Sequence, residues 1–268
     1  MPCAAKRRST AAANEPLHDT HKEEGPASAN ESLPWKDELL NIGEHSNMIK
    51  EIQQGKTLPE IQTEADFQAA SERGYQAASE YLNQHSKPFS EWTVNDLTKL
   101  HRLYFDEIYP HAGQLRQPGD LAAFSGRVGA DSKNIQAELQ LLTNQVKSLS
   151  KDLEGIDTPT GLSRRIGLIA FVHARLALIH PFQDGNGRWT RLITSALEKE
   201  WLPNTQRAQH VPRAIYMHAL KELPSNLGPL MNYHAERYGL RPSTLKAVRP
   251  TFPGQVTLER VMNFLRGN

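Results

Sequence analysis

One short segment, residues 180–191, combines residues that could hold a phosphate chain with a residue that could act as a base beside it. A proline follows His180 and cannot continue a helix, so the apolar stretch before it should end there and hold the imidazole at a helix C-terminus. Gly185 and Gly187 let the backbone turn sharply and approach a ligand closely. Together with Asn186, their N–H groups stand at the start of the next expected helix, where unpaired donors and the helix dipole favour an anion.

The same segment carries charges suited to a polyphosphate. Arg188 and Arg191 are three residues apart, so both should point along one side of the first helical turn and offer two guanidinium groups. Asp184 is a lone carboxylate at the mouth, and Mg²⁺ commonly binds one or two carboxylates and completes its shell with phosphate oxygens and water. Each residue alone has a simpler interpretation as a cap, a turn or a solvated face. Because all of them converge on one connection, we predict a polyphosphate site with a base beside it.

Two predicted helices must position this segment. Residues 165–180 are apolar on almost every face, which is typical of a helix buried at the centre of a fold. Residues 188–201 carry apolar side chains on one face, and Pro203 ends that pattern. The periodicity predicts further helices at Phe67–Leu82, from Thr93 to Ile108, and at Ile135–Leu149, Pro212–Leu223, Leu227–Tyr238 and Thr257–Leu265. Glycines break the pattern between residues 111 and 131, where we expect a short hairpin, so the predicted class is mainly α.

Composition excludes several classes of protein. The 268 residues include 31 Lys and Arg against 30 Asp and Glu, so a bulk positive field for nucleic acid is absent. A single cysteine excludes a disulfide framework and a cysteine-rich metal site. No apolar run reaches the roughly 20 residues of a membrane span, and the N-terminus shows no ordinary signal peptide. We therefore expect a soluble protein of a reducing compartment, the cytoplasm, with neither a nucleic acid nor a membrane as partner. Export by another signal stays open.

The segment from His180 to Arg191 resembles the signature of the Fic family, His-Pro-Phe-x-Asp/Glu-Gly-Asn-Gly-Arg-x-x-Arg, at every specified position. Residues 100–104 and 109–116 are also similar to Fic sequences, and the resemblance covers Trp92–Tyr238. It implies a Fic-type helical bundle with a small β-hairpin flap beside the active site. It also implies a protein adenylyltransferase, which moves AMP from ATP to a Ser, Thr or Tyr hydroxyl of a target protein and releases pyrophosphate.

The resemblance assigns roles within the motif. His180 would be the general base, and Asp184 would hold Mg²⁺ against the phosphates. The segment Phe124–Asn134 would be the flap that aligns the target chain as an added strand. Relatives that phosphorylate carry a lysine where Gly187 stands here, which favours AMP transfer. The nucleotide-binding residues would be Gly185, Asn186, Gly187, Arg188 and Arg191, with Tyr216 and Asn226 near the adenine, although the spacing there departs from the family pattern.

Many Fic proteins are inhibited by a helix with the pattern Ser/Thr-x-x-x-Glu-Gly/Asn. From Ser46, the glutamate position holds Lys50, and Glu51 follows one residue late. One residue is about 100° of helix, so Glu51 should face elsewhere unless the register slips by one residue, in which case Glu51 is the regulatory residue and inhibition is strong. We therefore expect a self-inhibitory helix that inhibits weakly, with an antitoxin-like partner as the alternative. A second match at 150–155 lies where the family does not place this element, and we take it as coincidence.

Two properties of the histidines stay open. A helix C-terminus raises the proton affinity of a histidine, whereas a general base must be neutral at the working pH. Arg188 and Mg²⁺ would act in the opposite direction on His180. His173 lies seven residues earlier on the same face, but no third metal ligand is evident, so we expect it to be a core or supporting residue.

The chain divides into a disordered tail at 1–34, a helical and regulatory region at 35–91, the Fic core at 92–238 and a basic extension at 239–268. The alternatives to a protein adenylyltransferase are a non-catalytic nucleotide-binding module and a relative that uses another nucleotide or removes AMP. The intact His180 and Asp184 favour an enzyme.

Overall fold

The computed structural model describes residues 45–85, 87–120, 122–124, 127–151, 159–203, 211–223 and 225–240. The predicted tail at 1–34, nearly all of the extension at 239–268 with its helix at Thr257–Leu265, and most of the second match at 150–155 lie outside these ranges.

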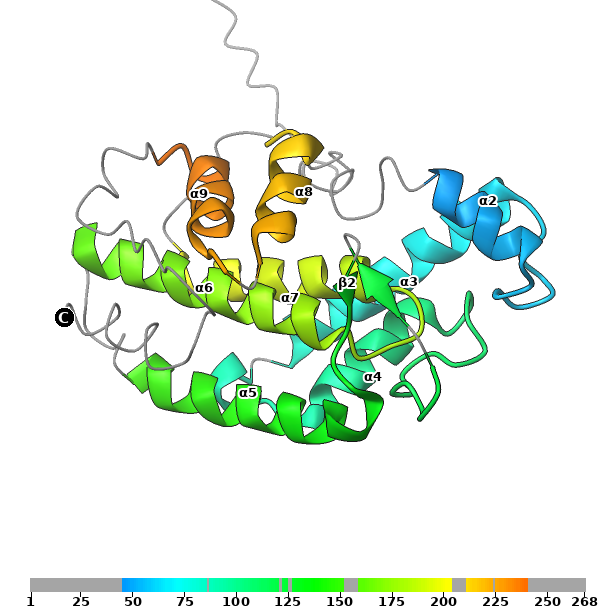
Figure 1. Ribbon diagram of the computed structural model, residues 1–268, viewed down its shortest axis with the longest axis horizontal. Helices are drawn as coiled ribbons and strands as arrows, with labels where there is room; N and C mark the ends of the chain where they lie inside the picture. The colour runs from blue at the N-terminus through cyan, green and yellow to red at the C-terminus, as the bar shows by residue number, and fades with distance from the viewer. Residues whose placement is uncertain are drawn as a thin grey trace, which may run out of the picture. The chain divides into compact units, whose positions relative to one another are not determined.

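Two adjacent helices form the centre of the fold, α6 (Pro159–Ile179) and α7 (Asn186–Trp201), as Figure 1 shows. The apolar residues of α6 from Ile166 onward are almost completely buried, which confirms the prediction of a central helix. The helix begins six residues before the predicted start at 165. Pro159 occupies its first position, where the absent N–H of proline costs no hydrogen bond.

A second pair of helices, α3 (Glu64–Gln84) and α4 (Val94–Phe105), packs closely together. Each begins with a capping box in which a threonine, Thr63 or Thr93, exchanges hydrogen bonds with the aspartate three residues later. The predicted start of α4 at Thr93 is therefore confirmed, but the helix ends at Phe105, before the predicted Ile108. A Cβ atom at Gly74 would lie 2.0 Å from the carbonyl oxygen of Tyr104, so this glycine permits the close approach of the two helices.

The remaining described helices surround the central pair. Helix α5 (Ile135–Lys151) packs on α6, and so does α9 (Gly228–Arg237), which also contacts α8 (Arg213–Glu222). Figure 1 shows α8 and α9 on one side of α6 and α7, with α4 and α5 on the other. Helix α2 (His45–Gln53) contacts α3, and two short 3₁₀ helices lie at Phe89–Glu91 and Ser132–Asn134.

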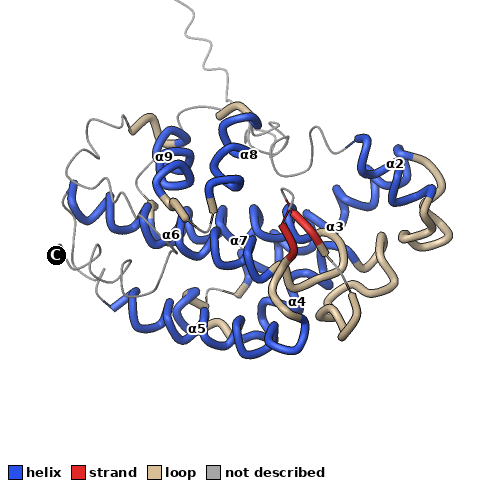
Figure 2. Tube along the Cα trace, in the orientation of Figure 1, coloured by secondary structure: helices blue, strands red, loops and turns tan. Residues whose placement is uncertain are grey.

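A two-stranded antiparallel hairpin is formed by β1 (Ala123–Phe124) and β2 (Arg127–Val128), which are drawn in red in Figure 2. It lies where the sequence predicts a hairpin, and the fold is mainly α, as expected. Within the described ranges, no helix combines the length and the apolar composition that crossing a lipid bilayer requires.

Candidate active site

The loop between α6 and α7 is fixed by two buried side chains. Asn186 bonds Phe182 in both directions, with its Nδ2 donating to the carbonyl at 2.7 Å and its Oδ1 accepting from the N–H at 3.0 Å. His101 of α4 stacks on the Phe182 ring, with the ring centroids 3.6 Å apart. Its Nδ1 accepts from the N–H of Gly113, so its Nε2 carries the hydrogen that is donated to the carbonyl of Asp184 at 3.1 Å. Burial lowers the pKa of His101 from 6.5 to about 3, so the ring stays neutral.

Gly185 begins α7 in a conformation that favours glycine, with φ at +77°. A Cβ atom at this position would lie 2.8 Å from the Phe105 ring. The helix starts at Asn186, so the N–H groups of its first residues have no carbonyl of the same helix to bond. The backbone N–H groups of Gly185, Asn186 and Gly187 thus stand at the start of the helix, where the sequence predicts the anion cradle.

His180 lies directly after α6 in the left-handed region of backbone space, with φ at +48°, where residues other than glycine are uncommon. Burial and the nearby charge of Arg116 lower its pKa from 6.5 to about 4, although a hydrogen bond with the backbone of Ala177 acts in the opposite direction. The sequence leaves open whether His180 is protonated. In the structure its imidazole is neutral, mainly because burial removes it from water.

Arg116 holds the His180 turn in place, and the sequence assigned it no role. Its side chain is 3% exposed and bonds backbone carbonyls only: His180 at 2.8 Å, Ala130 at 2.8 Å, Asp120 at 3.0 Å and Ile179 at 3.4 Å. These carbonyls belong to the end of α6, to the loop before the hairpin and to the segment after it. One guanidinium therefore joins His180 to the segment that the sequence predicts as the flap. A Cβ atom at Gly129, in that later segment, would meet His180 and Arg116 at less than 3.0 Å.

Asp184 faces two basic groups. Its Oδ1 lies 3.9 Å from Nζ of Lys56, and its Oδ2 lies 3.6 Å from Nε2 of His111. The His111 Nε2 atom is buried and has no hydrogen-bond partner among the described residues. In the described part of the chain, no three His, Cys, Asp or Glu side chains gather into a metal-binding group. A single carboxylate fits a Mg²⁺ ion that takes its other ligands from phosphate and water, and it does not fit an all-protein metal site.

The two motif arginines point into different environments, contrary to the expectation that they share one side of the helical turn. Arg188 is 4% exposed and lies against the rings of Phe67 and Phe105, at 4.9 and 4.8 Å from their centroids. Its Nη2 donates to the Tyr109 hydroxyl at 2.6 Å. Arg191 instead lies over the Tyr216 ring, 6.0 Å from its centroid.

The orientation of α2 corrects the predicted register. Tyr109 donates its hydroxyl hydrogen to Oε2 of Glu51 at 2.7 Å, and the hydroxyl oxygen of Tyr109 accepts from Nη2 of Arg188. Lys50 is exposed. The prediction that Glu51 faces away and Lys50 faces the arginines was therefore wrong. Burial raises the pKa of Tyr109 well above 10, so its hydroxyl stays protonated and bridges the carboxylate and the guanidinium.

The two residues predicted near the adenine differ in their surroundings. Tyr216 is buried beside Arg191 and is thus brought to the motif. The Oδ1 atom of Asn226 accepts from the N–H of Gly228 at 2.9 Å at the start of α9. The nucleotide-binding role of Asn226 stays a prediction.

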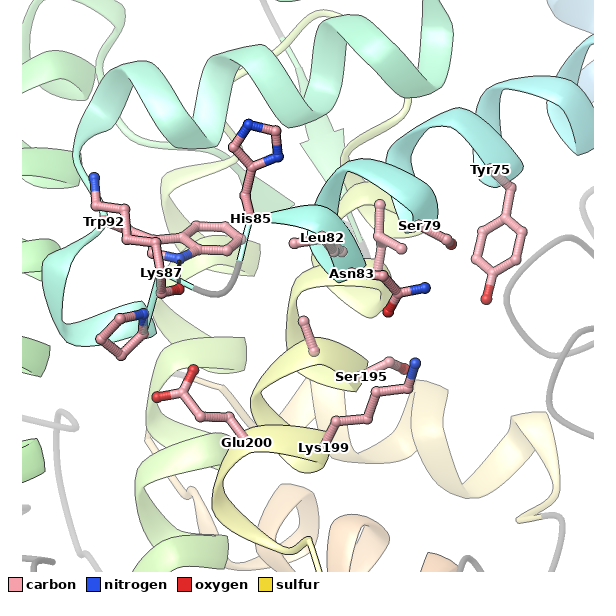
Figure 3. Close-up of a pocket in the computed structure, with 13 residues that line it drawn as sticks. Tyr75, Ser79, Leu82, Asn83, His85, Lys87, Trp92, Ser195, Lys199 and Glu200 are labelled. Atoms are coloured by element: carbon pink, nitrogen blue, oxygen red, sulfur yellow. Dashed lines mark hydrogen bonds between the residues drawn. The ribbon is translucent and has the colours of Figure 1, made fainter.

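A separate cavity of about 370 Å³ lies between the C-terminal half of α3 and the later turns of α7 (Figure 3). Tyr75, Ser79 and Asn83 of α3 face Ser195, Lys199 and Glu200 of α7 across it. None of the predicted site residues lines this cavity, so it is distinct from the anion cradle.

A sequence model of the Fic/DOC family matches residues 91–197, which contain the motif, the anion cradle and the flap. This part of the chain is a Fic domain. Protein adenylyltransferase Fic of Aedes aegypti is 25% identical over 162 residues, which are 59% of this chain and 30% of that protein. Protein adenylyltransferase Fic of Nematostella vectensis is 29% identical over 126 residues, 46% of this chain and 27% of that protein. The chain thus spans less than a third of the length of these curated relatives.

Solved structures share the fold of the Fic domain at low sequence identity. BepC from Bartonella tribocorum, with bound AMPPNP, has a TM-score of 0.54 and 18% identity, covering 68% of this chain and 90% of that chain. The N-terminal Fic domain of a VirB-translocated effector from Bartonella quintana, with bound ADP, has a TM-score of 0.55 and 19% identity. The match covers 71% of this chain and 93% of that chain.

The sequence did not predict the supporting residues that lie outside the motif at 180–191 and contact it. Arg116, Tyr109 and His101 lie in segments that resemble the family, but nothing in the types or spacing of these residues assigns them a task. The available signal was weak: Arg116 stands in a loop where a charged residue is ordinarily solvated.

Proposed function

We propose that this chain is a protein adenylyltransferase that transfers AMP from ATP to a Ser, Thr or Tyr hydroxyl of a target protein. In this reaction the hydroxyl oxygen bonds to the α-phosphorus, the bond between the α-phosphorus and its bridging oxygen breaks, and pyrophosphate leaves. The hydroxyl proton goes to the base. The names of the curated relatives and the AMPPNP and ADP bound in the two solved Fic structures support this proposal.

The observation that carries the proposal is a neutral imidazole held beside an anion cradle. A general base must be unprotonated at the working pH, and His180 meets this condition because its pKa is lowered to about 4. The cradle begins at Gly185, five residues later, so a phosphate held there would lie next to the base. Arg191 would contact the terminal phosphates of the nucleotide. Arg188, which lies toward α3 and α4, would stabilise the negative charge of the same phosphates.

The residues at Asp184 fit a Mg²⁺ ion, and we propose that this carboxylate holds it. When bound, the ion would neutralise charge on the phosphates. Lys56 already places positive charge near the same carboxylate, and His111 lies 3.6 Å from it, so the ion would rearrange these contacts. A reducing compartment, the cytoplasm, is our proposed location because the chain has only one cysteine.

The hairpin would present the target chain to His180. Val128 in β2 is 66% exposed, which is unusual for a branched apolar side chain and suits a strand that pairs with an extended peptide. Arg127 of the same strand donates to the carbonyl of Lys221, which ties the hairpin to the end of α8.

We also propose that α2 is a self-inhibitory helix, because Glu51 reaches the Tyr109–Arg188 pair. Its carboxylate places negative charge beside an arginine that the nucleotide phosphates would otherwise use.

The experiment that tests the proposal is transfer of label from α-³²P-ATP, with Mg²⁺, to the chain itself and to proteins of a cell lysate. His180→Ala should abolish the labelling while ATP still binds, because base removal costs roughly 10²–10⁴ in rate. His85→Ala, a change at an exposed histidine at the end of α3, serves as the matched control and should label normally. Label from γ-³²P-ATP instead would indicate phosphorylation and contradict the proposal.

A further inference from the structure

A buried chain of hydrogen bonds, called the histidine relay below, runs from α7 through α9 and α6 to α8. Glu198 Oε1 bonds His234 Nδ1 at 2.8 Å, and His234 Nε2 lies 3.1 Å from His173 Nδ1. His173 Nε2 lies 3.1 Å from the Tyr216 hydroxyl oxygen. Glu198, His173 and His234 are at most 3% exposed. Four helices thus contribute one member each to a continuous polar chain in the core.

The direction of every hydrogen bond in the relay follows from its acidic end. Glu198 Oε1 also accepts from Arg237 Nη1 at 2.9 Å, so the carboxylate is already balanced by a buried cation. Because a carboxylate accepts, His234 donates its Nδ1 hydrogen to Glu198, and in the tautomer with its single hydrogen on that atom its Nε2 is an acceptor.

The same reasoning extends to the other end. His173 must donate from Nδ1 to His234, which leaves its own Nε2 as an acceptor. Burial lowers the pKa of His173 well below 6.5, so this ring is neutral. The Tyr216 hydroxyl consequently donates its hydrogen inward.

Tyr216 connects the relay to the motif. Its ring lies under the Arg191 guanidinium, within the range in which a cation is attracted to an aromatic face. Inward donation by the hydroxyl increases the electron density of the ring and strengthens this attraction. Arg191 and Glu198 stand two turns apart on α7, so the relay starts on the helix that carries the motif, and its last member, Tyr216, contacts the same helix.

We propose that the histidine relay is a positioning network for Arg191. It fixes the Tyr216 ring, and the ring holds the guanidinium toward the terminal phosphates of the nucleotide. This inference rests on the proposed function in one respect, the role of Arg191 in binding those phosphates. His173 and Tyr216 are positioning residues in this account because they act through Arg191.

The first test compares the binding of ATP and AMP to the full chain by calorimetry. Tyr216→Phe removes one hydroxyl group, and His173→Phe interrupts the relay while keeping an aromatic ring. Each change should weaken ATP binding roughly 3- to 10-fold, the scale of one lost hydrogen bond or cation–π contact, and should leave AMP binding unchanged. Thr143→Val is the matched control and should change neither affinity. It removes a buried hydroxyl on α5 that donates to the carbonyl of Gln140 and accepts from the Gln140 side chain.

A double-mutant cycle shows whether the effect passes through Arg191. In an Arg191→Ala background, Tyr216→Phe should cause no further loss of ATP affinity. An equal loss of ATP and AMP affinity, or an additive loss in this background, would overturn the inference and leave AMP transfer untouched. If Arg191→Ala itself left ATP affinity unchanged, Arg191 would not bind the terminal phosphates and the inference would be wrong. The transfer of label from ATP would still test the proposed function separately.

The second test uses the natural chain and so does not depend on variants that fold. Long-range ¹H–¹⁵N NMR spectra of the histidine rings distinguish the two neutral tautomers. His173 and His234 should both carry their hydrogen on Nδ1 at pH 7. A hydrogen on Nε2 of either ring, or a protonated His234, would reverse the direction of the relay and refute it.

Discussion

Nε of Arg116 donates a hydrogen bond to the backbone carbonyl of His180 at 2.8 Å, while Nη2 of the same guanidinium bonds the carbonyl of Ala130 at 2.8 Å. The first carbonyl belongs to the base and the second to the segment that follows the hairpin. The position of His180, our proposed base, relative to the proposed flap is therefore set by one buried side chain. This contact also holds the unusual positive φ of His180, which costs energy unless the surroundings enforce it.

Replacing Arg116 should damage catalysis through both geometry and charge. Arg116→Met removes the four carbonyl contacts, and we expect the rate of AMP transfer at pH 7 to fall about 10- to 100-fold. It also removes a positive charge that lowers the pKa of His180, so the acid limb of the pH–rate profile should move to higher pH. Arg116→Lys keeps the charge and should leave the acid limb nearly in place while the rate still falls. A normal rate in Arg116→Met would contradict the role we give this residue.

The buried histidines should make the fold sensitive to mild acid. The pKa values of His101 and His180 lie at about 3 and about 4 in the folded chain and near 6.5 in the unfolded chain. The unfolded chain therefore binds more protons below pH 6.5, and stability falls as the pH drops. Each of the two should cost about 2 kcal/mol by pH 5 relative to pH 8, by the usual conversion of pKa shifts.

Urea unfolding at pH 8, 7, 6 and 5 measures this loss. His180→Asn should lose about 2 kcal/mol less than the natural chain over that range. Burial raises the pKa of Glu200 above 4.5, so protonation of this carboxylate acts in the opposite direction, and the comparison with His180→Asn isolates the contribution of the histidine. Constant stability from pH 8 to 5 would show that the two histidines are protonated in the folded chain.

The sequence predicted the parts of the molecule that depend on local pattern. The apolar faces of α6 and the capping threonine before α4 follow from residue types and spacing alone, whereas α7 begins at Asn186, two residues before the predicted start at 188. The direction of Arg188 could not be predicted, because it is set by Phe67 and Tyr109, which are distant in sequence. The register of α2 failed for the same reason: one residue decides which side chain faces inward, and the partner that selects it is Tyr109.

The contact between Lys56 and Asp184 should weaken Mg²⁺ binding. Lys56 Nζ lies 3.9 Å from the carboxylate that we propose as the metal ligand, so its positive charge repels the ion. Lys56→Ala should lower the Mg²⁺ concentration that gives half-maximal AMP transfer, whereas Asp184→Asn should raise it and be partly rescued by excess Mg²⁺. Lys147→Ala, on the exposed face of α5, changes the net charge equally and should have no effect. Equal Mg²⁺ dependence in Lys56→Ala and the natural chain would show that the ion binds elsewhere.

The last prediction concerns control by α2. Because Glu51 accepts a hydrogen bond from Tyr109, which itself accepts from Arg188, its negative charge acts on the arginine of the cradle. A nucleotide phosphate has to compete with this carboxylate and is repelled by it. Glu51→Gly should therefore raise the initial rate of self-labelling about tenfold or more, the scale of a charge-assisted hydrogen bond.

Two further variants identify the path of this inhibition. Tyr109→Phe removes the bridging hydroxyl but keeps the charge of Glu51, so it should activate less than Glu51→Gly. Lys50→Glu adds a carboxylate at an exposed position and should change the rate little, since that side chain points away from the site. If Lys50→Glu lowered the rate and Glu51→Gly left it unchanged, the helix would use the other register when nucleotide binds. The contact between Glu51 and Tyr109 would then have no regulatory role.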